Sequence, residues 1–159
     1  MYSVLDICRY IIHYSNAKGY PVSNLKLQKL LYFVQAYFLM TVSKRCFHEP
    51  IEAWAFGPVV PKAYREYVRF GACSIPDITS LTVRDENDLR NSGRKQYNDS
   101  VIADDDKDRI NAVIEKFSEH SATDLVALTQ SQKPWTDAYM SGLQAEITTK
   151  AIAEYFANN

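Results

Sequence analysis

Apolar residues recur at helical spacing through residues 23–40, which read SNLKLQKLLYFVQAYFLM. One face carries Leu27, Leu30, Leu31, Val34 and Phe38, and the other faces carry Tyr32, Phe33, Ala36, Tyr37 and Leu39. Other elements must cover a helix that is apolar nearly all round, so this segment predicts a buried, central helix.

Few polar residues interrupt this predicted helix, and some of them are expected to share a face. Gln28, Tyr32 and Gln35 lie three or four positions apart, the spacing of neighbours on a helix surface. Buried amides need hydrogen-bond partners, so we expect Gln28 and Gln35 to bond to other groups, such as the backbone of the segment that follows.

The following segment combines a short apolar run at 51–56 with two prolines that frame a turn. Gly57 precedes Pro58 and can adopt backbone angles that other residues avoid. Pro61 suits the first turn of a helix, where its missing N–H costs nothing, and Gly71 marks that helix's end. The helix then has an apolar stripe made of Tyr64, Tyr67 and Val68.

These two segments carry a resemblance to a known family. LKLQKLLYFVQAY followed by EAWAFGPVVPKAYREY resembles the SocA-like or Panacea antitoxin domain, which occurs in toxin–antitoxin pairs and often near prophages. The similarity extends to LVALTQSQKPWTDAY and ITTKAIAEYF near the end of the chain. The family often has a histidine shortly before its Pro-Trp, whereas this chain has Gln130 and Gln132 before Pro134-Trp135.

The resemblance implies a non-catalytic antitoxin that neutralises a cognate toxin, usually encoded beside it. Two routes are open in such a family: direct binding of the toxin, and delivery of the toxin to an ATP-dependent protease by an adaptor. An adaptor needs an accessible tail or loop for the protease, and the C-terminal segment TTKAIAEYFANN has the pattern of a capped helix. Direct protein–protein binding is therefore the predicted route, with the polar loop at about 85–100 as a further candidate contact. The oligomeric state stays open.

Length and composition restrict the class of protein. A chain of 159 residues is long enough for one domain that buries roughly 70% of its unfolded surface. A net charge of −1 gives no general attraction to nucleic acid or an anionic membrane, and no apolar run is long enough to span a bilayer. No signal peptide is visible. Three cysteines without a C-x-x-C pair suit reduced thiols and a cytoplasmic location: Cys8, Cys46 and Cys73.

The first half of the chain contains further helix and strand patterns. Ser3 and Asp6 have the spacing of a capping box for a helix that ends near Gly19, and Ser23 is expected to cap the central helix. Alternation in Ile75–Asp85 predicts a strand, which we pair with Ile51–Phe56 in a small sheet. The polar segment Asp85–Ser100 predicts an exposed loop.

The second half is helical in pattern. Asp104 begins a helix, and Ser121 and Asp124 form a capping box for the next. Pro134 interrupts that pattern, and Trp135–Met140 is expected to form a short helix that ends near Gly142. Thr148 is expected to cap the last helix, with a hydrophobic staple between Ile147 and Ile152. The first of these helices has one apolar face: Ile110, Val113, Ile114 and Phe117. The chain thus predicts a mainly α (α+β) fold, residues 1–159 forming one compact domain around the central helix with a small β hairpin or sheet.

Metal and catalytic sites are disfavoured, and no cofactor is expected. The spacing of a calcium loop is present in Asp104, Asp106, Asp108 and Glu115, but Arg109 stands where that loop needs glycine. Acidic residues at the start of a helix explain the same pattern. His48-Glu49 is followed at once by Pro50, unlike a zinc-protease helix. No nucleophile elbow, phosphate loop or dinucleotide turn is present, so the chain is predicted not to be an enzyme.

DNA binding, as an autoregulator of its own operon, is the rival function. The first two helices imitate a helix-turn-helix, but a recognition helix must offer polar side chains to base edges. The second helix is almost entirely apolar, which disfavours this reading.

Candidate partner contacts surround the two family motifs. We expect Trp54 and Phe56, which share one face of a strand, to pack in the core, although an exposed aromatic patch is the alternative. For Lys29 and Tyr32, the sequence favours neither a structural role nor contact with a partner over the other. The candidate partner-binding residues are Lys26, Lys29, Tyr32, Trp54, Gly57, Pro58, Val59, Pro61 and Tyr64.

Overall fold

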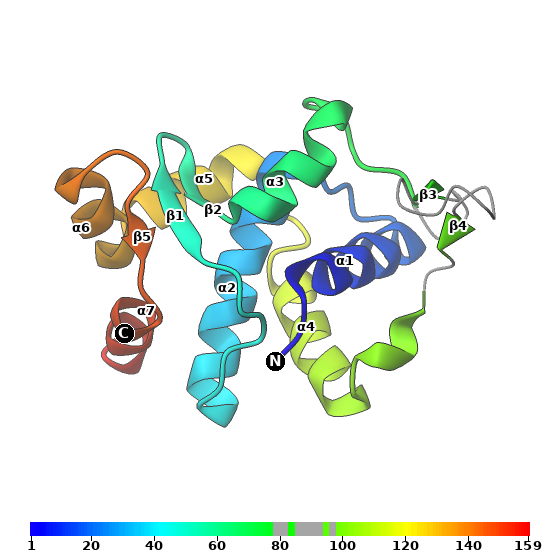
Figure 1. Ribbon diagram of the computed structural model, residues 1–159, viewed down its shortest axis with the longest axis horizontal. Helices are drawn as coiled ribbons and strands as arrows, with labels where there is room; N and C mark the ends of the chain where they lie inside the picture. Colours follow the sequence, from blue (N-terminus) through cyan, green and yellow to red (C-terminus); the bar gives the residue numbers. More distant parts are fainter. Residues whose placement is uncertain (78–82, 85–93, 96–97) are drawn as a thin grey trace.

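The computed structural model describes residues 1–77, 83–84, 94–95 and 98–159. Helix α2 (Asn24–Val42) runs through the middle of the molecule (Figure 1). Burial is continuous from Lys26 to Ala36, so this part of the helix has no exposed face. The predicted central helix is confirmed, and Ser23 caps it by accepting a hydrogen bond from the Lys26 N–H at 3.2 Å.

Other elements surround α2 on several sides. Its contacts include helices α1 (Val4–Lys18), α4 (Asp104–Lys116), α5 (Ala122–Gln130) and α7 (Thr149–Ala157). One hydrophobic cluster joins residues of all these helices. The mainly α (α+β) class is therefore confirmed. None of the helices described by the structure has the length and apolarity needed to cross a bilayer.

The capping box predicted at the start of α1 does not form. The Ser3 side chain makes no capping bond, and the Asp6 carboxylate instead pairs with Arg9 at 3.0 Å. The buried carboxylate of Glu49 replaces the box, because its Oε1 accepts a hydrogen bond from the Val4 N–H at 3.0 Å. A negative charge at this end also complements the helix dipole. Glu49, next to His48 in sequence, thus has a structural role.

Replacing Glu49 with alanine should lower the free energy of unfolding by roughly 1–2 kcal/mol, since the first turn of α1 loses its cap. Ser3→Ala is the matched control and should change stability little, because the Ser3 side chain caps nothing. Urea denaturation measures both. A larger loss for Ser3→Ala than for Glu49→Ala would contradict this assignment of the cap.

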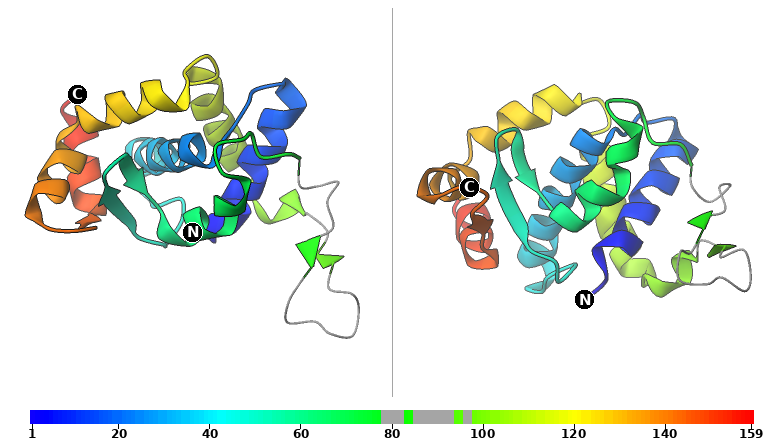
Figure 2. Two further views of the ribbon diagram at one scale, coloured as in Figure 1. Left: turned by 90° about the horizontal axis from the view of Figure 1, so that it is seen from above. Right: turned by 45° about the horizontal axis from the view of Figure 1, so that its top comes forward.

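A small antiparallel sheet has the order β2-β1-β5, formed by β1 (Ile51–Trp54), β2 (Gly57–Val59) and β5 (Glu146–Ile147). Trp54 pairs with Gly57, which leaves a two-residue turn at the hairpin tip. In all three views this β1–β2 hairpin lies between α2 and helix α6 (Lys133–Ser141) (Figure 2).

The predicted pairing of Ile75–Asp85 with Ile51–Phe56 is wrong, because β2 and β5 occupy both edges of β1. Strand β3 (Val83–Arg84) pairs with β4 (Arg94–Lys95) instead. Residues 85–93 and 96–97 of the predicted Asp85–Ser100 loop lie outside the described residues, as do residues 78–82 and Asp85 of the predicted strand. Asp99–Val101 forms a short 3₁₀ helix, η2.

Helix α3 (Pro61–Tyr67) follows the hairpin and begins at Pro61 as predicted. Tyr67 is buried, but Val68 is 50% exposed, so the predicted apolar stripe is wrong at that position. At Val68 the chain changes to a 3₁₀ helix, η1 (Val68–Phe70), whose tighter winding changes the direction of successive side chains. Gly71 follows with a positive φ of 57°.

The caps predicted in the second half are confirmed. Ser121 and Asp124 make both bonds of a capping box, each at 3.0 Å. Thr148 accepts a hydrogen bond from the Ala151 N–H at the start of α7. The predicted apolar face of α4 is buried: Ile110, Val113, Ile114 and Phe117.

Candidate functional site

Two side chains of α2 hold strand β2 and the residue after it. Lys29 Nζ donates a hydrogen bond to the Pro58 carbonyl at 3.0 Å, and Gln28 Oε1 accepts one from the Val60 N–H at 3.0 Å. The Gln28 amide also donates to Asn24 Oδ1. The expectation that Gln28 bonds the backbone of the following segment is confirmed.

Gln35, farther along α2, fixes the loop before β1 in the same manner. Its amide nitrogen donates to the Phe47 carbonyl at 3.0 Å, and its oxygen accepts from the Cys46 N–H at 2.7 Å. The second expected amide is therefore also satisfied by backbone. Together, Gln28, Lys29 and Gln35 attach both ends of the hairpin segment to the central helix.

Two side chains beyond the sheet hold the tip of the hairpin. Gln130 Nε2 donates to the Ala55 carbonyl and Trp135 Nε1 donates to the Trp54 carbonyl, each at 2.9 Å. Gln132 accepts a hydrogen bond from the Tyr32 hydroxyl at 2.8 Å. The two glutamines that precede Pro134-Trp135 therefore serve one network, which links α2, the hairpin and the α5–α6 junction.

Lys29 is the most unusual member of this network because its side chain is fully buried. Burial lowers its pKa to about 7, since the charged form loses its hydration. Lys26, 5% exposed, has a lowered pKa for the same reason and donates to the Phe117 carbonyl at 2.9 Å. Both lysines are therefore inside the fold.

The outer side of the hairpin exposes aromatic surface. Phe56 is 67% exposed, so the prediction that it packs in the core is wrong. Strand β1 ends at Trp54, and Phe56 falls in the turn rather than on the strand face that the alternation implied. Trp54 is half-buried and meets Tyr64 edge to face, with ring centroids 5.1 Å apart.

The nine predicted contact residues divide into two groups by burial. Three are half-buried at the surface: Trp54, Pro61 and Tyr64. Six are buried: Lys26, Lys29, Tyr32, Gly57, Pro58 and Val59. These six residues lie inside the fold and face no partner in this conformation. Sequence reasoning favoured a core position for Phe56 over the exposed alternative, although Gly57-Pro58 directly after it is a signal that the strand ends earlier.

More apolar side chains are exposed around the C-terminal end of α6. Tyr139 stacks on Trp135 with ring centroids 4.6 Å apart and is 44% exposed. Met140 and Leu143 are 86% and 95% exposed. The Trp135 indole contacts both the hairpin carbonyl and Tyr139, so it connects the hairpin tip to this second apolar area.

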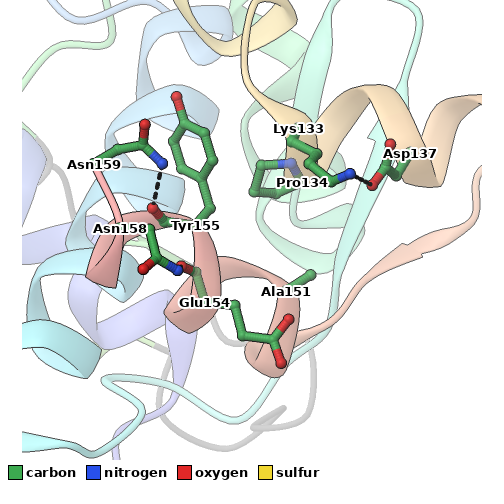
Figure 3. A pocket seen from close by; sticks show the side chains of 8 residues that line it. All are labelled: Lys133, Pro134, Asp137, Ala151, Glu154, Tyr155, Asn158 and Asn159. Atoms are coloured by element: carbon green, nitrogen blue, oxygen red, sulfur yellow. Dashed lines mark hydrogen bonds and ion pairs between the residues drawn. The ribbon is translucent and has the colours of Figure 1, made fainter.

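A groove of about 320 Å³ lies between α6 and α7 (Figure 3). Tyr155 and Ala151 line one side, and Lys133 pairs with Asp137 at 3.5 Å on the other. Because its cation is already paired, the groove has no concentrated charge with which to attract a charged ligand.

The metal and DNA alternatives find little support in the geometry. Across residues 1–77, 83–84, 94–95 and 98–159, no three His, Cys, Asp or Glu side chains gather as a metal site would require. Helix α4 begins at Asp104, so Asp104 and Asp106 lie in its first turn, as the helix-start interpretation holds. Glu115 lies near the other end of the helix, where it accepts hydrogen bonds from the Tyr14 and Tyr20 hydroxyls. Helix α2 is covered by other elements, and its Lys26 and Lys29 are buried, so it cannot serve as a recognition helix in this fold.

Fold and site together define a mainly α domain in which a buried polar network holds an aromatic hairpin at the surface. The model of the family described as "Antitoxin SocA-like, Panacea domain" matches residues 27–136, and the chain belongs to this family. A 45-residue stretch is 51% identical to the protein named Antitoxin SocA of Caulobacter vibrioides (strain NA1000 / CB15N). That match covers 28% of this chain and only 24% of the relative. No solved structure matches the chain.

Proposed function

We propose that this chain is a cytoplasmic, non-catalytic antitoxin that neutralises a cognate toxin by binding it directly. Family membership and the relative named Antitoxin SocA support the antitoxin role. The observation that most supports direct binding is the fixed, exposed tip of the β1–β2 hairpin. An inhibitor that acts by binding needs a stable protein–protein interface, and this tip offers the centre of one.

The hairpin tip has the properties of an interface anchor. Phe56 is largely exposed, while the carbonyls of Trp54 and Ala55 on its N-terminal side are held by Trp135 and Gln130. A large aromatic side chain on a fixed backbone loses little conformational freedom on binding. Such residues often dominate the binding energy of an interface. The half-buried Trp54 and Tyr64 extend the aromatic surface beside it.

Co-expression with the product of the neighbouring reading frame tests this function. We expect the neighbour to be toxic alone, the antitoxin to relieve that toxicity, and the two proteins to co-purify. Purified antitoxin should also suppress the toxin's activity with no protease present. A non-toxic neighbour, or toxicity that this protein does not relieve, would overturn the antitoxin role.

The adaptor route makes the opposite forecast for the amount of toxin. Under direct binding, toxin accumulates in cells as a complex. If toxin instead disappears when the antitoxin is expressed, and persists in a strain that lacks the ATP-dependent protease, the adaptor route replaces direct neutralisation. A salt-sensitive footprint on the operator would support the DNA-binding alternative.

Phe56→Ala should weaken toxin binding by about 30-fold or more, the usual effect of removing an interface anchor worth roughly 2 kcal/mol. Stability should change little, because most of this side chain lies in solvent. The control is Val101→Ala in η2, an exposed apolar residue outside the hairpin. Calorimetric titration and thermal unfolding of each variant measure the two effects. Equal affinities for wild type and Phe56→Ala would remove the hairpin tip from the interface.

A further inference from the structure

Lys29 is fully buried, and it forms no ion pair within the part of the chain that the structure describes. An ammonium group has three N–H donors. Within the described residues, Lys29 Nζ donates a hydrogen bond to the Pro58 carbonyl. Strand β2 has no ionisable side chain, and the ionisable residue of α5, Asp124, is exposed at the far end of that helix and bonded to Ser121. On α2, Lys26 donates to Phe117 and Tyr32 to Gln132.

The hairpin backbone lies directly on the Lys29 stem. A Cβ atom added to Gly57 would stand 2.7 Å from Lys29 Cε and 2.9 Å from Thr129 Oγ1. Glycine is therefore needed at this point for the backbone to approach so closely. Lys29 is enclosed by the hairpin and α5, so movement of the hairpin away from α2 would bring its ammonium group into contact with water.

We propose that closure of the β1–β2 hairpin over Lys29 is coupled to the release of a proton from that side chain. A neutral amine still donates to the Pro58 carbonyl, and its burial costs far less than burial of an unpaired charge. Protonation therefore favours an open hairpin, in which the ammonium group is hydrated.

The sign of the pH dependence follows from proton linkage. In the closed state the pKa of Lys29 is lowered to about 7, and in an open, hydrated state it returns to the ordinary value of 10.5. Between these pH values the open state binds more protons, so closure becomes more favourable as the pH rises through this window. Below pH 7 both states are protonated and the preference levels off.

Because of this coupling, the fraction of molecules with a closed hairpin would depend on pH near neutrality. If the proposed function holds, affinity for a toxin that contacts Phe56 should fall as the pH drops toward 6. Closure itself is a property of the chain alone, so it can be tested without a toxin.

Hydrogen exchange of the hairpin in the free protein tests the coupling. The reporters are the Val60 amide, bonded to Gln28, and the Trp135 indole N–H, bonded to the Trp54 carbonyl. After correction for intrinsic exchange rates, the opening constant at pH 6 should be about ten times that at pH 8. Amides in the middle of α4 provide a reference that should change less.

Two variants separate Lys29 from other groups that titrate near neutral pH. Lys29→Met should make the opening constant independent of pH, whereas Lys26→Met, which removes the other buried lysine of α2, should keep the tenfold change. Equal opening constants at both pH values in the wild type, or a tenfold change that persists in Lys29→Met, would overturn the proposal. If Lys29→Met fails to fold, the test is an NMR pH titration of the Lys29 Cε resonance in the wild-type protein. A midpoint near pH 7 supports the coupling, and one near pH 10 overturns it.

Discussion

Substituting valine for Gly57 should lower the free energy of unfolding by roughly 2–6 kcal/mol. Gly57 has a φ of +105°, which L-residues rarely adopt, and forcing valine into it costs about 1–3 kcal/mol. The new side chain would also overlap the buried stem of Lys29 and the hydroxyl of Thr129, which adds about 1–3 kcal/mol of overpacking. Urea denaturation gives the total.

Gly19→Val is the matched control for this substitution. Gly19 also has a positive φ, of 78°, but a Cβ added there would meet no atom within 4 Å. The control should therefore show the cost of backbone strain alone, and the difference between the two variants isolates the close approach of the hairpin to Lys29. Equal losses for the two variants would mean that the hairpin yields easily at Gly57.

The central helix and most caps could be predicted because their signals are local. A helix that is apolar all round has to be covered wherever its neighbours come from, which placed α2 correctly. A capping box joins residues three apart, and at Ser121 and Asp124 nothing else competes for the bonds. The same pattern failed at Ser3, since Glu49, 45 residues from Val4, supplies the cap instead. A contact between residues so far apart in the chain cannot be predicted from the local sequence pattern.

The small sheet was predicted correctly, but one of its strand partners was predicted incorrectly for a related reason. The third strand, β5, has only two residues, Glu146 and Ile147, too few to show the alternation that identifies a strand. The segment with visible alternation pairs elsewhere, through Val83–Arg84. The order of the strands depends on which segments the tertiary structure brings to the two edges of β1. Local sequence patterns do not contain this information.

The backbone partners of the two amides could be predicted from the sequence, whereas the full burial of Lys29 could not. Gln28 and Gln35 stood on the face of a buried helix, so their need for partners followed from burial alone. Lysine is almost never fully buried, so a side chain such as Lys29 is ordinarily placed at the surface. Its cover comes from β2 and from Thr129 of α5, 100 residues farther along the chain. We therefore propose Phe56 as a partner contact beside Trp54 and Tyr64, in place of the buried lysines.

Leu31→Ala should lower the free energy of unfolding by roughly 2–5 kcal/mol, the range for removing a buried leucine side chain and leaving a cavity. Leu31 is fully buried in the continuously buried part of α2, where several elements pack around the helix. The surrounding side chains cannot collapse into the space without moving more than one of those elements, which favours the upper half of the range.

Leu143→Ala controls for the change of residue type, because Leu143 is 95% exposed and its truncation should alter stability by about 0.5 kcal/mol or less. Urea denaturation of both variants, with the slope of the transition compared with that of the wild type, separates lost stability from a change in compactness. A Leu31→Ala variant close to wild type would contradict the organising role of α2. Because the hairpin and its network attach to α2, partial loss of this core should also speed hydrogen exchange at the Val60 amide, even though Leu31 makes no polar contact with the hairpin.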